Sequence, residues 1–209
     1  MLSELLETRH STGVGWIPIL DPREPTEDSN ESCMMSKHVK VMPHLYPLLR
    51  GFDYTCFLDS KVGIISEDFV EDMIRKHCME TPTPAALLLR YHWYGHNNIW
   101  VEYFYSVAQE RYRRESDKML AYMERRFQEG WKEDIPIHSA CGLLLRNQRH
   151  LLMNAINETW YRHIQECGLN DQVSFFFVAQ IFAGGGAIHS FQEYPYLDYT
   201  ARSLALRKR

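Results

Sequence analysis

The sequence predicts an α/β protein with a mostly parallel central sheet and helices on its faces. Short apolar runs alternate along the chain with longer segments of helical periodicity, an order that is typical of this class. The 209 residues suit one α/β unit with a sizeable core. We therefore expect a single domain over residues 1–209.

The composition narrows the classes of function. Hydrophobic residues make up 45% of the chain, and 23 Lys and Arg against 27 Asp and Glu give a net charge of −4. That charge disfavours a broad nucleic-acid-binding surface, so no nucleic-acid partner is predicted. The five cysteines form no CxxC pair, which favours a reducing compartment over a disulfide framework. No apolar run of about 18 residues occurs and no signal peptide is evident, so we expect a soluble chain without a membrane span, cytoplasmic by default.

The first part of the chain is predicted to alternate strands and helices. We expect a strand at 15–20, a loop at 21–32 and a short or broken helix at 36–49. A strand at 54–59, a second short strand at 62–65 and a helix at 66–78 should follow. Two prolines interrupt the first helix. Ser66 is expected to cap the second helix, whose last turn is basic.

The C-terminal half continues the alternation. We expect a buried strand at 85–91, a loop at 92–98 and one long or two consecutive helices at 99–130. A strand at 138–146 should be followed by helices at 148–167 and 170–182. A glycine turn at 184–186 and a tail at 190–209 complete the chain. Gly130 is predicted to end the long helical segment. Asn147 could cap the next helix, and Asn170 or Asp171 the last.

The strand at 54–59 ends in a carboxylate, Asp59. Ligands of open α/β sheets bind outside the carboxyl ends of the strands. A carboxylate at that position can bind a hard divalent cation, which in turn holds a diphosphate. A turn or helix-cap role is the alternative, and the position alone leaves both open.

Basic residues in the broken helix could accompany Asp59. Lys37 and Lys40 would share a helix face, as would Lys40 and His44. Such groups beside an acidic strand end suit an anionic ligand, for example a nucleoside diphosphate. Without further support, a solvated charged face is the simpler interpretation.

Two further patterns allow a chemical role beside a structural one. The local sequence around Asp171 and Gln172 favours an N-cap, although the carboxylate could also face a substrate hydroxyl as metal partner or general base. His92 and His96 have a spacing that binds zinc on a helix. Gly95 and two asparagines indicate a loop there, and no third ligand is evident, so zinc is not predicted.

Taken in order, these pieces resemble the hexosyltransferase-like family of plants and bacteria, formerly a domain of unknown function, whose plant members are linked to mucilage and pollen. The resemblance covers roughly residues 15–182. It rests on "DPR" at 21–23, Lys37, Lys40, Pro43–His44, "YTCFLDS" at 54–60, His92, Glu102, Gly142, Arg146, Trp160 and "DQVSF" at 171–175.

The resemblance implies a GT-A-like fold and a glycosyltransferase that moves a hexose from a nucleotide-diphosphate sugar to a glycan or protein acceptor. It implies that Asp59 holds a divalent cation (Mn²⁺ or Mg²⁺) or the diphosphate. The same resemblance assigns the other site residues in outline. Phosphate or pocket contacts fall to Lys37, Lys40, His44, His92, Glu102 and Arg146, and sugar or acceptor contacts to Asp171 and Gln172.

Two departures from the family pattern leave an alternative open. Members usually begin with a further strand and a "YT…G.YD" turn, so this chain is expected to lack the first strand of the sheet and could be a catalytically inactive or truncated GT-A-like binding module. The strand tip carries Asp59, Ser60 and Lys61 in place of Asp-x-Asp. Lys61 could itself touch phosphate and reduce the need for metal. Plant members of the family are Golgi proteins, which is the alternative to a cytoplasmic location.

Overall fold

A computed structural model describes residues 23–24, 26–59, 62–64, 66, 68–92, 97–192 and 197–198. It divides into two units, Met1–Ser32 and Cys33–Arg209. The predicted strand at 15–20, Lys61 and His96 lie outside the described residues, as does most of the predicted tail. A single domain over residues 1–209 stays a prediction.

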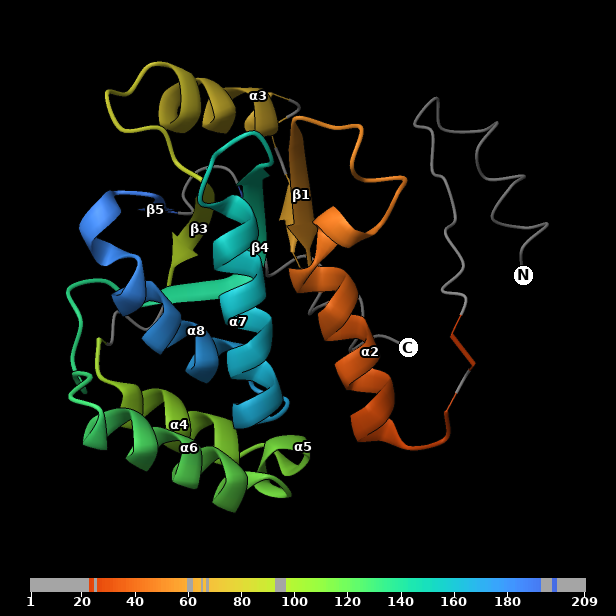
Figure 1. Ribbon diagram of the computed structural model, residues 1–209, viewed down its shortest axis with the longest axis vertical. Helices are drawn as coiled ribbons and strands as arrows, with labels where there is room; N and C mark the ends of the chain where they lie inside the picture. The colour runs from red at the N-terminus through yellow and green to blue at the C-terminus, as the bar shows by residue number, and fades with distance from the viewer. Residues whose placement is uncertain are drawn as a thin grey trace. The chain divides into compact units, whose positions relative to one another are not determined.

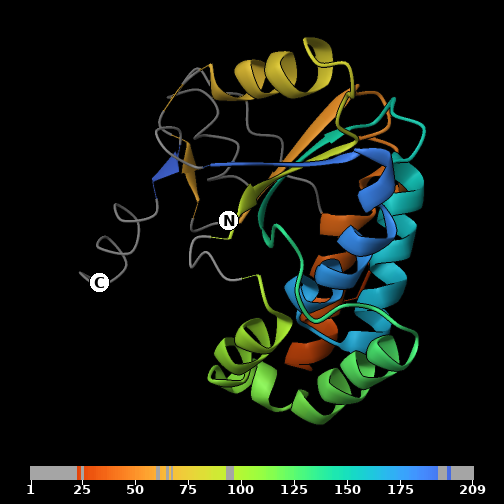
Figure 2. The same cartoon turned by 90° about the vertical axis from the view of Figure 1, so that its left-hand side faces the viewer.

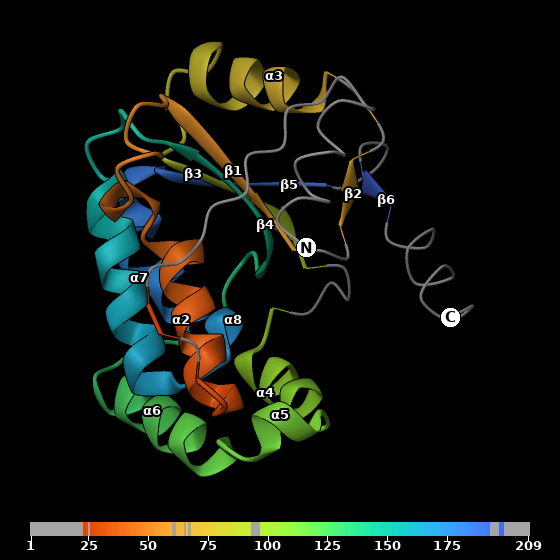
Figure 3. The ribbon, with the colours of Figure 1, turned by 90° about the vertical axis from the view of Figure 1, so that its right-hand side faces the viewer.

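The second unit is built on a four-stranded sheet in the order β1-β4-β3-β5, seen with its covering helices in Figures 1 and 3. These strands are β1 (Tyr54–Leu58), β3 (Leu87–Tyr91), β4 (Ser139–Asn147) and β5 (Ile188–Phe191). β2 (Gly63–Ile64) and β6 (Leu197–Asp198) form a separate antiparallel pair. The predicted α/β class is confirmed.

The prediction of a mostly parallel sheet is wrong for the described strands. β4 pairs antiparallel with both β1 and β3, and only β3 and β5 pair parallel. The chain between β3 and β4 leaves and re-enters the sheet at the same edge, because His92 N donates to His138 O at 2.9 Å. A strand that re-enters where its predecessor ended has to run in the opposite direction.

The helices agree with the predicted periodicity, with shifted ends. They are α2 (Ser29–Val41), α3 (Phe69–Ile74), α4 (Ile99–Val107), α5 (Glu110–Arg113), α6 (Ser116–Gln128), α7 (Met153–Cys167) and α8 (Asp171–Ile181), with 3-10 turns at Pro43–Leu45 and Ala183–Gly185 and a π turn at Arg75–Met79. The segment at 99–130 forms three helices, and Gly130 follows the last with φ of 92°.

Several predicted helix starts are corrected. α2 begins at Ser29, inside the predicted loop, because Asp28 Oδ1 accepts hydrogen bonds from the backbone N of Asn30 and Glu31. α3 begins after Asp68, not at Ser66. α7 begins five residues after 148, because Asn147 Oδ1 accepts from Arg149 N and closes a turn instead of capping the helix.

Alternate residues of the sheet face two different cores. Leu87, Leu89 and Leu144 pack against α7 and α8, whereas Leu88, Leu143 and Leu145 pack against α3, as the period of two in a strand requires. Figure 2 shows α4, α5 and α6 gathered beyond the ends of the other helices. A third cluster joins them to α8 through buried residues that include Ile99, Tyr122, Phe176 and Phe177.

β4 carries an irregularity that matters for the site. Leu89 pairs with Leu144 while the next residue, Arg90, pairs with Ala140, so β4 bulges between these positions. Gly142 lies in the bulge, and its carbonyl accepts a hydrogen bond from Asp59 N at 2.8 Å. Bulges redirect side chains at the end of a sheet, and this one lies beside the predicted ligand-binding edge.

Candidate functional site

Two lysines of α2 hold one buried carboxylate of α8. Lys37 and Lys40 leave the same face of α2, as the sequence predicts. Lys37 Nζ lies 2.7 Å from Asp171 Oδ1, and Lys40 Nζ lies 2.6 Å from Asp171 Oδ2. The three side chains are 13%, 6% and 8% exposed. The alternative of a solvated charged face is therefore wrong.

Asp171 is available to the lysines because its neighbour caps the helix. Asn170 is the N-cap residue of α8, and its side chain accepts hydrogen bonds from the backbone N of Gln172 and Val173. Trp160 Nε1 donates to the backbone carbonyl of Asp171 at 3.0 Å and fixes the start of the helix further. The sequence left Asn170 and Asp171 open as the cap, and the structure assigns it to Asn170.

The surroundings of Asp171 determine its protonation. Burial alone would raise the pKa of this carboxyl group, but Lys37 and Lys40 outweigh burial and hold the pKa well below its ordinary value. Burial lowers the pKa of Lys37, yet Asp171 raises it to a net value above the ordinary one. A carboxylate stabilised in this way is a weak proton acceptor, so it is poorly suited to act as a general base. The geometry instead favours a role for Asp171 in positioning the two lysines.

Asp59 lies beside the same ion group at the end of β1. Its Oδ1 is 3.7 Å from Lys40 Nζ, and its side chain is 31% exposed, the most exposed of the group. Lys40 Nζ also lies 4.9 Å from the centre of the Phe57 ring. Asp59 is thus the charged side chain of this group that is most accessible to a ligand from solvent.

The bulge in β4 leaves room for Asp59 next to another cation. A Cβ atom at Gly142 would lie 3.1 Å from Asp59 Oδ2 and 3.6 Å from Arg90 Nη2. Glycine at this position therefore lets the carboxylate approach the strand. Arg90 is buried, 6% exposed, and adds a third cationic side chain to the site.

The described residues do not fit Mn²⁺ or Mg²⁺ at Asp59. These ions favour a set of several oxygen ligands. Lys40 Nζ contacts both Asp59 and Asp171, so an ammonium group already occupies the position of a cation that would bridge the two carboxylates. Arg90 Nη2 and Asp59 Oδ2 both border Gly142, so this guanidinium adds a positive charge that disfavours a metal ion there.

Arg146 lies behind the lysines and is 1% exposed. Its Nη2 donates to the Lys40 carbonyl at 2.8 Å, and its Nε donates to Asn157 Oδ1 at 3.1 Å. Asn157 also contacts His44 Nδ1 at 3.2 Å, and His44 Nε2 lies 3.6 Å from Glu158. Arg146 and His44 therefore attach the end of α2 to α7, and within the described part of the chain neither contacts Asp59 or Asp171.

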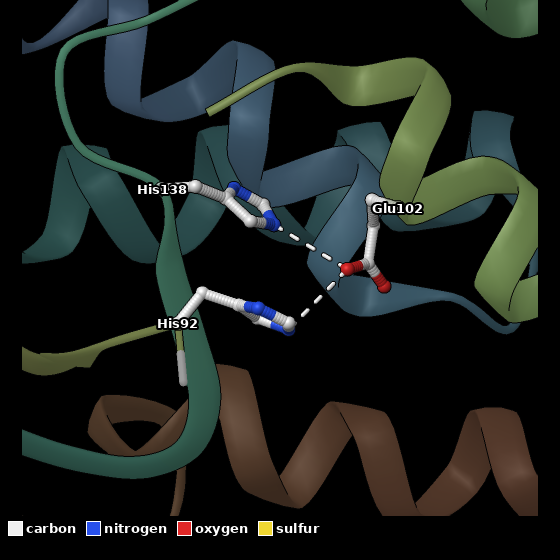
Figure 4. A group of neighbouring side chains, drawn as sticks. All are labelled: His92, Glu102 and His138. Atoms are coloured by element: carbon white, nitrogen blue, oxygen red, sulfur yellow. Dashed lines mark ion pairs between the residues drawn. The ribbon is translucent and has the colours of Figure 1, made fainter. Parts of the chain in front are cut away.

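A second group of side chains lies at the same sheet edge (Figure 4). His92 Nε2 lies 3.4 Å and His138 Nε2 lies 3.5 Å from one oxygen of Glu102, Oε2. Burial would raise the pKa of Glu102, but His138, His92 and Gln172 together lower it. His92, Glu102 and His138 could jointly hold a metal ion.

Gln172 connects the two groups. Its Nε2 donates to Glu102 Oε2 at 2.7 Å, and its Oε1 accepts from the backbone N of Cys141 at 3.4 Å. Since Gln172 follows Asp171 on α8, one helix start fixes both the lysine group and the histidine group. The side chain of Gln172 thus has contacts at both ends within the protein.

The structure adds two residues that sequence reasoning missed, Arg90 and His138. Arg90 stands near the end of an otherwise apolar strand, and this charge was the available signal. His138 directly precedes another apolar strand, but its importance depends on strand pairing. Tyr91 and Ser139 are register partners, so His92 and His138 are the next residues across the ladder.

Fold and site together define an α/β protein with a buried ion group and a His–Glu–His group at one sheet edge. No protein-family model matches the chain, and no curated protein matches its sequence. The chain is similar to the crystal structure of mouse xyloside xylosyltransferase 1 in its apo form, with a TM-score of 0.48 and 11% sequence identity. The alignment covers 91% of this chain and 59% of that chain.

The described helices include none that is both long enough and apolar enough to span a membrane.

Proposed function

We propose that the chain is a glycosyltransferase domain that binds a nucleotide-diphosphate sugar and transfers its hexose to a glycan or protein acceptor. The observation that carries the proposal is the charge at the sheet edge. Lys37, Lys40 and Arg90 bring three positive charges, and Asp59 and Asp171 bring two negative charges. The excess positive charge lies where α/β sheets bind ligands, and it suits a diphosphate.

The described residues would divide the work in this proposal. Lys37 and Lys40 would neutralise the diphosphate, which is the leaving group of sugar transfer, and Arg90 would add to the positive field. Asp171 would hold the two ammonium groups in place. His92, Glu102 and Gln172 would border the sugar or the acceptor from the adjacent group. The motif resemblance to hexosyltransferase-like proteins supports the same class of substrate.

Thermal unfolding of the full chain tests the proposal. We expect one of the uridine, guanosine or adenosine diphosphates, or its sugar conjugate, to raise Tm by about 5–10 °C at a ligand concentration about 100-fold above Kd. Because lysines and not a metal supply the positive charge, the shift should be the same in EDTA and in Mn²⁺. Lys37→Met should lose most of the shift, measured against its own ligand-free Tm.

Two variants control this experiment. Lys76→Met removes an exposed lysine of the π turn after α3 and should keep the full shift. Asp59→Asn removes a negative charge beside Lys40 and should keep or enlarge the shift in EDTA. A shift that needs Mn²⁺ and disappears in Asp59→Asn would instead support a metal at Asp59. No shift with any of these nucleotides would contradict the proposal.

A binding module without turnover is the second candidate, favoured by the two ion pairs that keep Asp171 from acting as a base. Sugar-nucleotide hydrolysis or transfer by the purified chain separates the two. Turnover that falls in the Lys37→Met variant supports the transferase. Nucleotide binding without turnover, over a panel of glycan and protein acceptors, supports the module.

A further inference from the structure

We propose that His92, Glu102 and His138 form a zinc site with three protein ligands. The proposal concerns a different set of residues from the lysine group, and it does not depend on sugar transfer. The pairing of two strands brings the first two ligands together. The backbone hydrogen bond from His92 N to His138 O extends the ladder of β3 and β4 by one residue.

The strand pairing brings the two imidazoles side by side. Residues directly opposite each other on antiparallel strands have neighbouring side chains, and the two rings have their centroids 5.1 Å apart. Glu102 approaches from the first turn of α4, whose N-cap Asn98 accepts a hydrogen bond from Trp100 N. Figure 4 shows both imidazoles directed at the carboxylate.

The separations match a metal ligand set better than hydrogen bonds. The distances of 3.4 Å and 3.5 Å from the His Nε2 atoms to Glu102 Oε2 are long for an N–H···O bond, which is about 2.7–3.2 Å. Zinc lies about 2.0–2.1 Å from nitrogen and oxygen ligands, which places tetrahedral ligands about 3.3 Å apart. All three ligand atoms lie within 4.8 Å of one another.

The crowding at one oxygen supports the same conclusion. His92, His138 and Gln172 each direct a nitrogen at Glu102 Oε2, with Gln172 closest at 2.7 Å. A carboxylate oxygen has two lone pairs, so Glu102 Oε2 can accept the Gln172 hydrogen bond and at the same time ligate one metal ion. One metal ion held by both imidazoles would replace two of these contacts. Glu102 Oε2 would then bind the metal and accept one hydrogen bond.

The residues around the group suit a metal site. Ser106 Oγ donates to Glu102 Oε1 at 3.1 Å, and Asn170 Nδ2 donates to Ser106 Oγ. Such bonds orient a ligating carboxylate. The side chains of His92, Glu102 and His138 are 9%, 9% and 1% exposed, so the ligands are largely shielded from solvent. Two imidazoles and one carboxylate favour zinc over Mg²⁺ or Ca²⁺ and leave a fourth position for water.

Metal analysis of the full chain tests the site. After chelator treatment and dialysis against zinc, the folded protein should retain one zinc per chain and none of an equal concentration of Mg²⁺ or Ca²⁺. Cobalt should give the strong visible absorption of a four-coordinate ion. Competition with a chelating dye gives the affinity, which should fall at least tenfold in Glu102→Gln and in His138→Gln.

His163→Gln is the matched control, because His163 is a buried imidazole that contacts Tyr122 OH and belongs to neither group. It should keep the wild-type zinc affinity. If a ligand variant fails to fold, Ser106→Ala leaves all three ligands in place and should weaken zinc binding by about tenfold. A wild-type chain that holds no more zinc than His138→Gln, or a Ser106→Ala variant with unchanged affinity, would overturn the site. No nucleotide is present in these measurements, so their outcome is separate from that of the proposed transfer.

Discussion

Asp171→Asn is expected to lower the free energy of unfolding by about 3–5 kcal/mol, because it leaves two buried ammonium groups without their counter-charge. Lys37 and Lys40 contact opposite oxygens of Asp171 at 2.7 Å and 2.6 Å. Asparagine has nearly the same shape, so the loss reports charge and not volume. Urea unfolding followed by circular dichroism measures the change.

The same substitution at an exposed ion pair provides the control. Asp72→Asn removes the exposed partner of Arg75 and should leave the urea midpoint within experimental error. The triple variant Lys37→Met, Lys40→Met, Asp171→Leu should recover most of the stability lost in Asp171→Asn, since no buried charge then lacks a partner. An Asp171→Asn protein as stable as wild type would show that the lysines do not depend on this carboxylate.

The acid dependence of stability provides a second measurement on the same group. The pKa of Asp171 is depressed in the folded state, and an unfolded Asp has a pKa of about 3.9. Its contribution to stability is therefore complete above about pH 5 and is lost as the pH falls through the unfolded value towards the folded one. Wild-type stability should fall more steeply than that of Asp171→Asn between about pH 5 and pH 2.

Arg146→Met is expected to lower the free energy of unfolding by about 2–4 kcal/mol and to weaken the response to nucleotide. Burial lowers the pKa of this guanidinium to about 10, so it remains charged near neutral pH. Methionine fills part of the volume but leaves the Lys40 carbonyl and Asn157 Oδ1 without their donor. Lys40 would then be less well positioned for a diphosphate.

Arg149→Met is the control for Arg146→Met, because Arg149 is 77% exposed and pairs with Asp53 at the surface. It should change neither stability nor the nucleotide shift. The two measurements also separate two roles for Arg146. A loss of the shift at unchanged stability would mean that Arg146 contacts the ligand, as the family resemblance implies. A loss of stability measured in the absence of ligand would show that Arg146 acts by attaching α2 to α7.

The sequence predicted those parts of the fold that depend on local pattern. The apolar runs became β1, β3 and β4, and the spacing of Lys37 and Lys40 correctly placed both on one helix face. Asp59 lies at the end of its strand as predicted. These features follow from periodicity along a single segment.

Features that depend on pairing between distant segments could not be predicted. The direction of β4 is set by the helices between it and β3, and the partnership of His92 with His138 follows from that direction. Without His138, the sequence offered His96 as the nearest second histidine and no third ligand. Likewise, Lys40 could be recognised as an ammonium between two carboxylates only once Asp59 and Asp171 were brought together.

The bulge in β4 also restricts which changes in length this strand can tolerate. Three residues, 141–143, lie between Ala140 and Leu144, which pair with the adjacent residues Arg90 and Leu89, and the middle one, Gly142, lies beside Asp59. Because side chains alternate between faces, deleting Gly142 would turn every residue before it to the opposite side of the sheet. Such a deletion would turn His138 away from Glu102. It would also remove the Gly142 carbonyl that holds Asp59 at the end of β1. Homologous chains that keep both groups should therefore conserve the number of residues between His138 and Arg146, even where the residue types vary.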